Sequence, residues 1–279
     1  MKDFSTSYPN TWCPGCSNNI ALEAIKEVFA DFVKSGFKKN NLVAVTDIGC
    51  VGKFYDRLDM NSFYALHGRT LVTALGIKMA NPNLKVIGFL GDGGAYAEGA
   101  NHLIQMSRLN PDITALVFNN RVFALTVGQA TPVTEVGYRG NTTPEGSKDN
   151  PYNPLSVALS AGATFIARVS VFDPNSFKRI IKSAMDHQGF SLVEIIQPCL
   201  TFRPNDFASL RQNQNFVSEN QKNNYVEARR LIDSWNYDNS QPPLGIFYEV
   251  QKSTWGEKRV IKRSTRRNIN KKILEQELL

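Results

Sequence analysis

Short apolar segments alternate with longer segments of helical periodicity through the first 200 residues. The apolar segments, each short enough to be a buried strand, are 42–46, 84–90, 113–118, 164–169 and 191–197. The segments that carry apolar residues at helical spacing are 19–32, 70–80, 95–108, 155–161 and 174–187, the last with Asp173 as its N-cap. This alternation predicts an α/β fold: a doubly wound, mostly parallel sheet covered by helices on both faces.

Two parts of the chain break the pattern. Residues 126–154 are rich in Gly, Pro, Thr and Asn, and a loop this long in a compact domain is usually functional or disordered. From about residue 201 the chain becomes polar and then basic. We therefore expect a cofactor-binding domain at 1–200. Residues 201–279 are expected to form an irregular C-terminal extension that covers a metal centre or contacts a partner.

The net charge of +7 belongs to the end of the chain. Residues 258–272 hold eight Lys and Arg and no acid, so the remainder carries a net charge of −1. A solvated terminus or a docking segment for an acidic partner explains this run. No aromatic residues alternate with the charges, which argues against a nucleic-acid ligand. No window is long and apolar enough to span a membrane and no signal pattern precedes the domain, so we expect a cytoplasmic protein.

Polar or reactive segments directly follow four of the predicted strands. They are residues 47–50, 91–94 and 119–120, together with Cys199. Ligands of open α/β sheets collect at the carboxyl ends of the strands. The sequence therefore predicts a single site at that edge of the sheet.

Residues 91–94 (Gly-Asp-Gly-Gly) lie between a predicted strand and a predicted helix. Glycines let the backbone approach a phosphate, and the helix N-terminus offers free N–H groups. Asp92 suits Mg²⁺, to which Asn120 and the carbonyl of Val122 can add oxygen ligands. The motif alone is also typical of a tight βα turn. Its combination with Asn120, twenty-eight residues after Asp92, resembles the thiamine-diphosphate motif of transketolase-like enzymes.

The chain has four cysteines, Cys13, Cys16, Cys50 and Cys199. Cys13 and Cys16 form a CxxC pair, which suits a redox dithiol, half of a zinc site or half of an iron–sulfur site. Four thiolates suit either zinc or a [4Fe–4S] cluster, and the spacing does not separate the two.

Several blocks in order resemble one family, the β subunits of 2-oxoacid:ferredoxin oxidoreductases. These blocks are residues 12–16 (Trp-Cys-Pro-Gly-Cys), 46–50 (Thr-Asp-Ile-Gly-Cys), 66–70 (Leu-His-Gly-Arg-Thr), 91–93 with 101–102 (Asn-His), 119–120, 128–132 (Gly-Gln-Ala-Thr-Pro) and 197–199 (Gln-Pro-Cys). The resemblance covers about two thirds of the chain. It implies a thiamine-diphosphate-binding fold.

The resemblance also implies the ligand sets. Cys13, Cys16, Cys50 and Cys199 would ligate one [4Fe–4S] cluster, while Asp92, Asn120 and the Val122 carbonyl would hold Mg²⁺ against thiamine diphosphate. The full set of residues implied at the thiamine cofactor is Ile48, Gly49, Cys50, His67, Gly91, Asp92, Gly93, Asn120, Val122, Leu125 and Thr126. Among the three histidines, we single out His67 as the catalytic candidate, through a hydrogen bond to diphosphate or substrate.

The activity implied is oxidative decarboxylation of a 2-oxoacid to acyl-CoA and CO₂, with electrons passed through the cluster to ferredoxin. An α subunit, or α and γ subunits, would supply the pyrimidine-binding domain, and the isolated chain would be inactive. CoA and the 2-oxoacid would be the substrates.

Two positions depart from the family pattern. Gly94 stands where a second acid is usual, and Val127 stands where some members carry a lysine that can pair with a distal carboxylate. Val127 therefore favours pyruvate or a small aliphatic 2-oxoacid over 2-oxoglutarate, unless the partner subunit sets the specificity. The same chemistry on indolepyruvate is a further alternative.

Three other classes of protein would explain part of this pattern. A thiamine enzyme without redox chemistry would leave the cysteines unused. A zinc-binding nucleic-acid protein would leave the pairing of Asp92 with Asn120 unexplained. An electron-transfer subunit without thiamine would not need Asp92 for cofactor binding.

Overall fold

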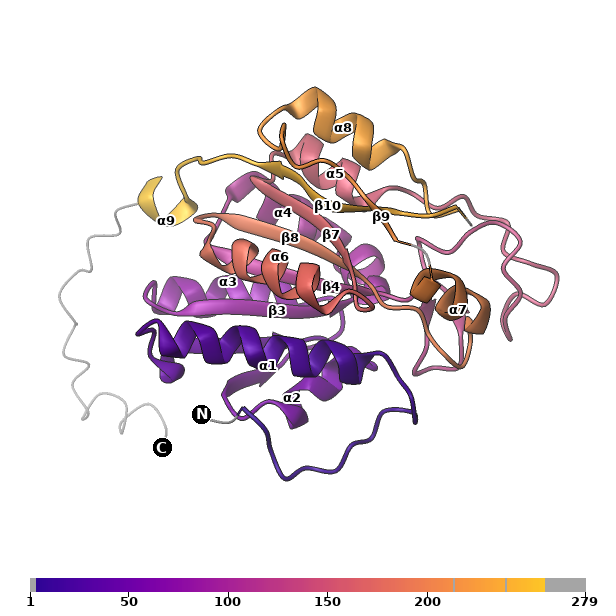
Figure 1. Cartoon of the computed structure of the whole chain (residues 1–279), viewed down its shortest axis with the longest axis horizontal. Helices are drawn as coiled ribbons and strands as arrows, with labels where there is room; N and C mark the ends of the chain where they lie inside the picture. Colours follow the sequence, from indigo (N-terminus) through magenta and orange to yellow (C-terminus); the bar gives the residue numbers. More distant parts are fainter. Residues whose placement is uncertain (1–3, 213, 239, 259–279) are drawn as a thin grey trace, which may run out of the picture.

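A computed structural model describes residues 4–212, 214–238 and 240–258, which are arranged around one twisted sheet (Figure 1). The sheet has eight strands in the order β2-β1-β3-β4-β8-β7-β10-β9. Their bounds are β1 Leu42–Thr46, β2 Asn61–Tyr64, β3 Lys85–Gly91, β4 Ile113–Asn119, β7 Phe165–Ser170, β8 Phe190–Ile196, β9 Asn215–Phe216 and β10 Pro243–Glu249. Neighbours from β2 to β7 pair in parallel, and β10 runs antiparallel to β7. The predicted mostly parallel α/β sheet is confirmed.

Helices cover both faces of this sheet. On one face, α1 (Asn18–Lys34) and α6 (Pro174–Asp186) lie side by side (Figure 1). The other face is covered by α3 (Thr70–Ala80), α4 (Ala100–Leu109), α5 (Pro154–Ala161) and α8 (Tyr225–Asp233). Because both faces are covered, all seven residues of β4 are buried, which explains its unbroken apolar run.

Local signals set several helix ends. The side chain of Asp173 accepts hydrogen bonds from the backbone N–H groups of Asn175 at 3.1 Å and Ser176 at 3.2 Å. This N-cap starts α6 as predicted. At the other end of a helix, Gly162 adopts a left-handed φ of +102° and closes α5.

The helix predicted at 95–108 is two elements rather than one. A π-helical turn, η3 (Gly94–Glu98), precedes α4, with Gly99 between them. Gly68 packs closely against this turn, because a Cβ atom at Gly68 would lie 2.5 Å from the Cβ of Glu98. Single π-helical turns of this kind are frequent at functional sites.

The chain after residue 200 is more regular than the predicted irregular extension. It forms α7 (Pro204–Gln212), β9, α8, β10 and the short α9 (Trp255–Lys258). Leu244, Ile246 and Phe247 of β10 are buried, so this apolar run extends the sheet instead of lying over it. The predicted domain boundary at residue 200 stays a prediction, and the basic run from residue 259 lies outside the described residues.

Shorter elements complete the described chain. They are η1 (Lys39–Asn41), η2 (Val51–Lys53), α2 (Phe54–Arg57) and the hairpin of β5 (Val122–Phe123) with β6 (Gln129–Ala130). The edge strand β2 was not predicted, because its side chains are mostly exposed and form no apolar run. Among the described residues, no helix combines the length and apolar character that crossing a membrane requires.

Candidate cofactor site

A cavity of about 220 Å³ lies where β1, β3 and β4 end. Its walls come from segments that are far apart in the sequence. All the residues implied at the thiamine cofactor line it: Ile48, Gly49, Cys50, His67, Gly91, Asp92, Gly93, Asn120, Val122, Leu125 and Thr126. The carboxyl-end edge of the sheet therefore brings the predicted set into one place, as parallel topology requires.

Asp92 lies at the bottom of this cavity and is 2% exposed. Thr131 Oγ1 donates to its Oδ2 at 2.7 Å, and the backbone N–H groups of Asp92 and Asn120 also donate to the carboxylate. Burial outweighs these bonds and raises the pKa of Asp92 to about 7. A buried acid without a cationic side chain beside it is a suitable ligand for a metal ion.

The turn after β4 presents the two other candidate Mg²⁺ ligands. Arg121, between Asn120 and Val122, has a left-handed φ of +59°, which is uncommon for a residue with a side chain. The side chain of Asn119 holds this turn by accepting from the Arg121 backbone N–H at 3.0 Å. The Asn120 side-chain oxygen accepts from the Val122 N–H at 3.0 Å. These two short-range hydrogen bonds fix the conformation of the turn.

The departure at Gly94 has a structural reason. A Cβ atom at Gly94 would lie 1.8 Å from Oδ2 of Asp47, so no larger residue fits beside that carboxylate. At Gly93 a Cβ atom would lie 2.1 Å from Phe123 Cε1. Both glycines are therefore required by close packing around the cavity floor.

The four cysteines lie in one neighbourhood beside the cavity. Cys50 lines the cavity, and its carbonyl accepts from Trp12 Nε1 at 2.7 Å. Burial is the main cause that raises the pKa of Cys50 to about 11, and Cys13, Cys16 and Cys199 each raise it further. This mutual influence requires the four thiols to be near one another.

The thiols do not meet at a single point. Across residues 4–212, 214–238 and 240–258, no three His, Cys, Asp or Glu side chains are close enough together to hold one metal ion. Polar groups of the 199–202 segment approach two of the sulfurs. Thr201 Oγ1 lies 3.9 Å from Cys13 Sγ, and the Phe202 N–H lies 3.5 Å from Cys199 Sγ.

Known proteins similar to this chain include a family of cofactor-binding domains that spans this site. The family described as thiamine pyrophosphate enzyme, C-terminal TPP binding domain, covers residues 47–195. A 2-oxoglutarate synthase subunit, KorB, of Archaeoglobus fulgidus is 38% identical over 86% of this chain and 84% of its own length. The β subunit of a 2-oxoacid:ferredoxin oxidoreductase from Saccharolobus solfataricus is 33% identical over 91% of this chain and 87% of its own. The chain belongs to the β subunits of 2-oxoacid:ferredoxin oxidoreductases.

A solved structure agrees with this assignment to a family of multi-subunit oxidoreductases. The 2-oxoglutarate:ferredoxin oxidoreductase from Magnetococcus marinus, with 2-oxoglutarate, coenzyme A and succinyl-CoA bound, superposes with a TM-score of 0.85. It is 29% identical, and the match covers 91% of this chain and 86% of that one. A 2-oxoglutarate oxidoreductase subunit of Mycobacterium tuberculosis is 39% identical, although this chain spans 56% of its length.

Three of the four relatives above are named for 2-oxoglutarate, the alternative substrate, so the expected preference for pyruvate stays a prediction. The structure weakens the argument from Val127 as well. This β subunit exposes 54% of Val127, which does not line the cavity. Its φ of +74° is an outlier for a β-branched residue.

Sequence analysis did not identify Asp47 as a buried acid that fixes two backbone segments beside the cavity. The residue is buried and accepts hydrogen bonds through Oδ1 from the backbone N–H groups of Ile48 at 2.8 Å and Gly68 at 3.0 Å. Its Oδ2 has no hydrogen-bond partner among the described residues, and burial raises its pKa. The signal in the sequence was an acid placed directly after a strand.

His67 lies in the cavity wall as predicted for a residue near the cofactor. Its Nδ1 is 3.6 Å from the Glu98 carboxylate, and its ring centroid is 6.0 Å from that of Phe123. His187 has a structural position instead, since its Nε2 lies 2.8 Å from Thr164 Oγ1 in the protein interior. The position of His67 leaves its catalytic role a prediction.

Proposed function

We propose that this β subunit holds thiamine diphosphate through Mg²⁺ and one [4Fe–4S] cluster, and that with its partner subunits it oxidatively decarboxylates 2-oxoglutarate. The products would be succinyl-CoA and CO₂, with the electrons leaving through the cluster to ferredoxin. One observation carries the proposal. Cys50 belongs both to the wall of the cofactor cavity and to the neighbourhood of the four thiols. A cofactor in that cavity and a cluster on those thiols would be adjacent.

The residues around the cavity fit a magnesium ion. Asp92 offers a buried carboxylate, Asn120 an amide oxygen and Val122 a backbone carbonyl, which are the hard oxygen ligands that Mg²⁺ prefers. Burial is the main cause of the raised pKa of Asp92, and no cationic side chain of the described residues offsets it. A bound divalent cation would supply that compensation.

The four thiols fit an iron–sulfur cluster by ligand type and number. Burial raises the pKa of both Cys16 and Cys50, and nearby Lys53 offsets only part of this rise, so a bound metal would be needed to hold them as thiolates. Zinc accepts the same ligand set, and the metal and sulfide analysis described below separates the two.

Thiamine diphosphate supplies the electron-accepting ring that the decarboxylation needs. The chain itself contributes orientation and exclusion of water. Phe118, Phe123 and Leu125 give the cavity apolar walls, and His67 would donate a hydrogen bond to the diphosphate or the substrate. An α subunit, or α and γ subunits, would close the cavity over the pyrimidine end of the cofactor.

Support for 2-oxoglutarate comes from the relatives' names, together with the position of Val127 outside the cavity lining. The absence of a lysine at position 127 therefore carries little weight against a substrate with a distal carboxylate. Steady-state kinetics of the complete complex with 2-oxoglutarate and with pyruvate would test the choice. A kcat/KM that is higher for pyruvate would overturn it.

Metal and sulfide analysis with EPR spectroscopy of the anaerobically purified complex tests the cluster. Iron with matching sulfide, and a signal that appears on reduction with dithionite, are expected. Zinc in place of iron would break the electron path and exclude the proposed oxidoreductase function.

An electron-transfer subunit without thiamine is the second candidate, since the four thiols alone would serve it. Asp92→Ala separates the two functions. We expect this variant to lose thiamine diphosphate while it retains its iron. An unmodified protein that carries iron but binds no thiamine diphosphate, with Asp92→Ala behaving the same, would favour the electron-transfer subunit.

A further inference from the structure

Four charged side chains form an ionic cluster between the turn after β4 and the C-terminal part of the chain. We name Arg121, Glu135, Arg203 and Asp206 the ionic tie. Arg121 NH2 lies 2.6 Å from Asp206 Oδ2, and Arg203 NH2 lies 2.7 Å from both Glu135 oxygens. Arg203 also contacts Asp206, and Arg121 lies 3.4 Å from Glu135. The side chains are 4–19% exposed, so water screens these pairs little.

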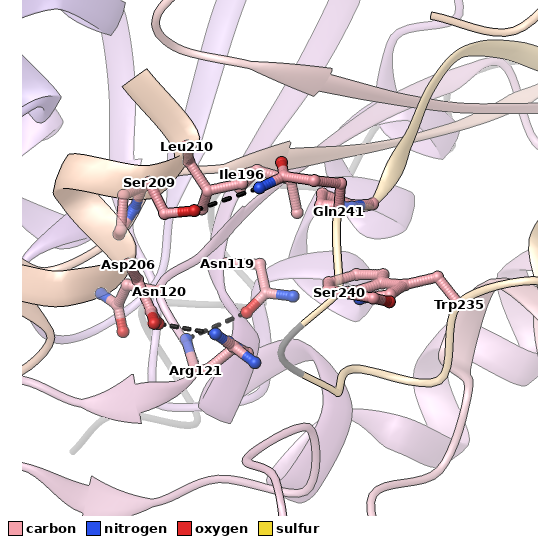
Figure 2. A pocket seen from close by; sticks show the side chains of 12 residues that line it. Asn119, Asn120, Arg121, Ile196, Asp206, Ser209, Leu210, Trp235, Ser240 and Gln241 are labelled. Atoms are coloured by element: carbon pink, nitrogen blue, oxygen red, sulfur yellow. Dashed lines mark hydrogen bonds and ion pairs between the residues drawn. The ribbon is translucent and has the colours of Figure 1, made fainter. Parts of the chain in front are cut away.

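The ionic tie acts on the strained part of the cofactor site. Arg121 is the left-handed residue between Asn120 and Val122. Its guanidinium also donates to the carbonyls of Tyr237 and Asp238, both at 3.1 Å. Figure 2 shows Arg121 reaching Asp206 while Asn119 holds the backbone of the same turn. The side chain of Arg121 is thus fixed by the C-terminal part of the chain.

The other end of the tie belongs to the segment that follows Cys199. The Arg203 N–H donates to the Cys199 carbonyl at 2.9 Å, and Asp206 lies in the first turn of α7. Helix α7 therefore connects the cysteine segment with the turn that presents Asn120. Neither Arg203 nor Asp206 lines the cofactor cavity itself.

We infer that Asp206 is a positioning residue for the divalent-cation site, which it holds in shape through Arg121. The inference rests on the proposed function, because it takes Asn120 and the Val122 carbonyl as Mg²⁺ ligands. A turn with an unfavourable φ keeps its shape only while its surroundings determine it. Without the carboxylate of Asp206, Arg121 loses its closest partner and the turn can relax. The two ligand oxygens would then no longer be aligned in advance for the metal.

The chain offers a matched control for Asp206. Asp112 also lies between two cations, 2.6 Å from Lys78 and 3.7 Å from Lys85, and its side chain is 27% exposed against 19% for Asp206. It directly precedes β4, at the edge of the sheet opposite the cavity. Asp112→Asn therefore removes a similar charge pair without touching the cofactor site.

The experiment uses the complete complex with its partner subunits and saturating thiamine diphosphate. Equilibrium dialysis gives the dissociation constant of Mg²⁺, and the activity gives the concentration of Mg²⁺ at half saturation and kcat at excess Mg²⁺. For Asp206→Asn we expect Mg²⁺ to bind about tenfold more weakly, the lower end of the loss seen when a residue that orients the ligands of a metal is removed. At excess Mg²⁺ its kcat should approach that of the wild type. Asp112→Asn should bind Mg²⁺ as the wild type does.

Two results would overturn the inference. The first is an unchanged Mg²⁺ affinity in Asp206→Asn when Asn120→Ala has lost binding, which would leave the proposed function intact. The second is an equal loss in Asp206→Asn and Asp112→Asn, which would mean general destabilisation. If neither the wild type nor Asn120→Ala responds to Mg²⁺, the proposed function itself fails.

A second variant covers the case in which Asp206→Asn does not assemble. Arg121→Lys keeps the charge but loses the planar fork that reaches Asp206 and two carbonyls at once. A weaker affinity for Mg²⁺ is again expected, and wild-type affinity in this variant would contradict the inference.

Discussion

Two buried acids of this protein lie in opposite electrostatic surroundings. Glu194, on β8, accepts hydrogen bonds from Asn119 at 2.9 Å, Tyr237 at 2.8 Å and Tyr96 at 3.2 Å, and it pairs with Arg168 Nε at 2.5 Å. Both side chains of this ion pair are 0% exposed. The charge of Glu194 is therefore neutralised within the protein.

Asp92, at the end of β3, has no cationic partner within the part of the chain that the structure describes. One hydroxyl and two backbone N–H groups reach it, and burial raises its pKa to about 7. Asp47 nearby keeps one carboxylate oxygen without a hydrogen bond among the described residues. The buried acid of the core is thus neutralised by an arginine, whereas the two acids at the cofactor edge are less fully satisfied by the described residues.

The largest effect on function is expected from Asp92→Asn. Loss of a direct ligand should weaken Mg²⁺-dependent binding of thiamine diphosphate by at least about 100-fold. The metal-free chain should be no less stable at about pH 8, because an amide avoids the burial of a charge. Calorimetric titration and urea unfolding measure the two quantities. A large loss of stability with unchanged binding would reverse the comparison.

Arg168→Met should lower the stability of the chain, in contrast to Asp92→Asn. It leaves Glu194 buried without its cation, which costs about 3–5 kcal/mol of unfolding free energy. Urea unfolding of the metal-free chain measures this loss. The double variant Arg168→Met with Glu194→Gln should lose less than the single one, because no uncompensated charge remains.

Gly94→Ala should cost about 1–3 kcal/mol, since its Cβ would lie 1.8 Å from Asp47 Oδ2. Removal of that oxygen in Asp47→Ala should restore part of the loss, and a double-mutant cycle by urea unfolding would detect the coupling. Strictly additive losses would show that the two residues do not compete for the same space.

The smallest effect is expected from His187. Burial lowers its pKa below 6.5, and Gln251 Nε2 lies 3.4 Å from its Nδ1, which suits the neutral ring. Below about pH 6.5 the unfolded chain binds a proton that the folded chain resists, so the unfolding free energy falls as the pH falls. His187→Gln should reduce this slope between about pH 5 and 7. An unchanged slope would mean that His187 protonates equally in both states.

The sequence by itself predicted the five central strands β1, β3, β4, β7 and β8 and the edge of the sheet where the candidate site lies. Apolar runs such as Leu42–Thr46 and Ile113–Asn119 are buried on both faces and allow no other assignment. In a parallel sheet, the residues that follow the strands lie at one edge. The sequence therefore predicted that Asp92, Asn120 and Cys50 lie close together.

Only the tertiary structure decided the contacts between distant side chains. The space beside Gly94 is taken by Asp47, and Arg121 meets Asp206 across 85 positions of the chain. The strand β10 was missed because its apolar run lies within polar sequence. Hydrophobic periodicity reports which face of an element is buried, but not which residues meet there.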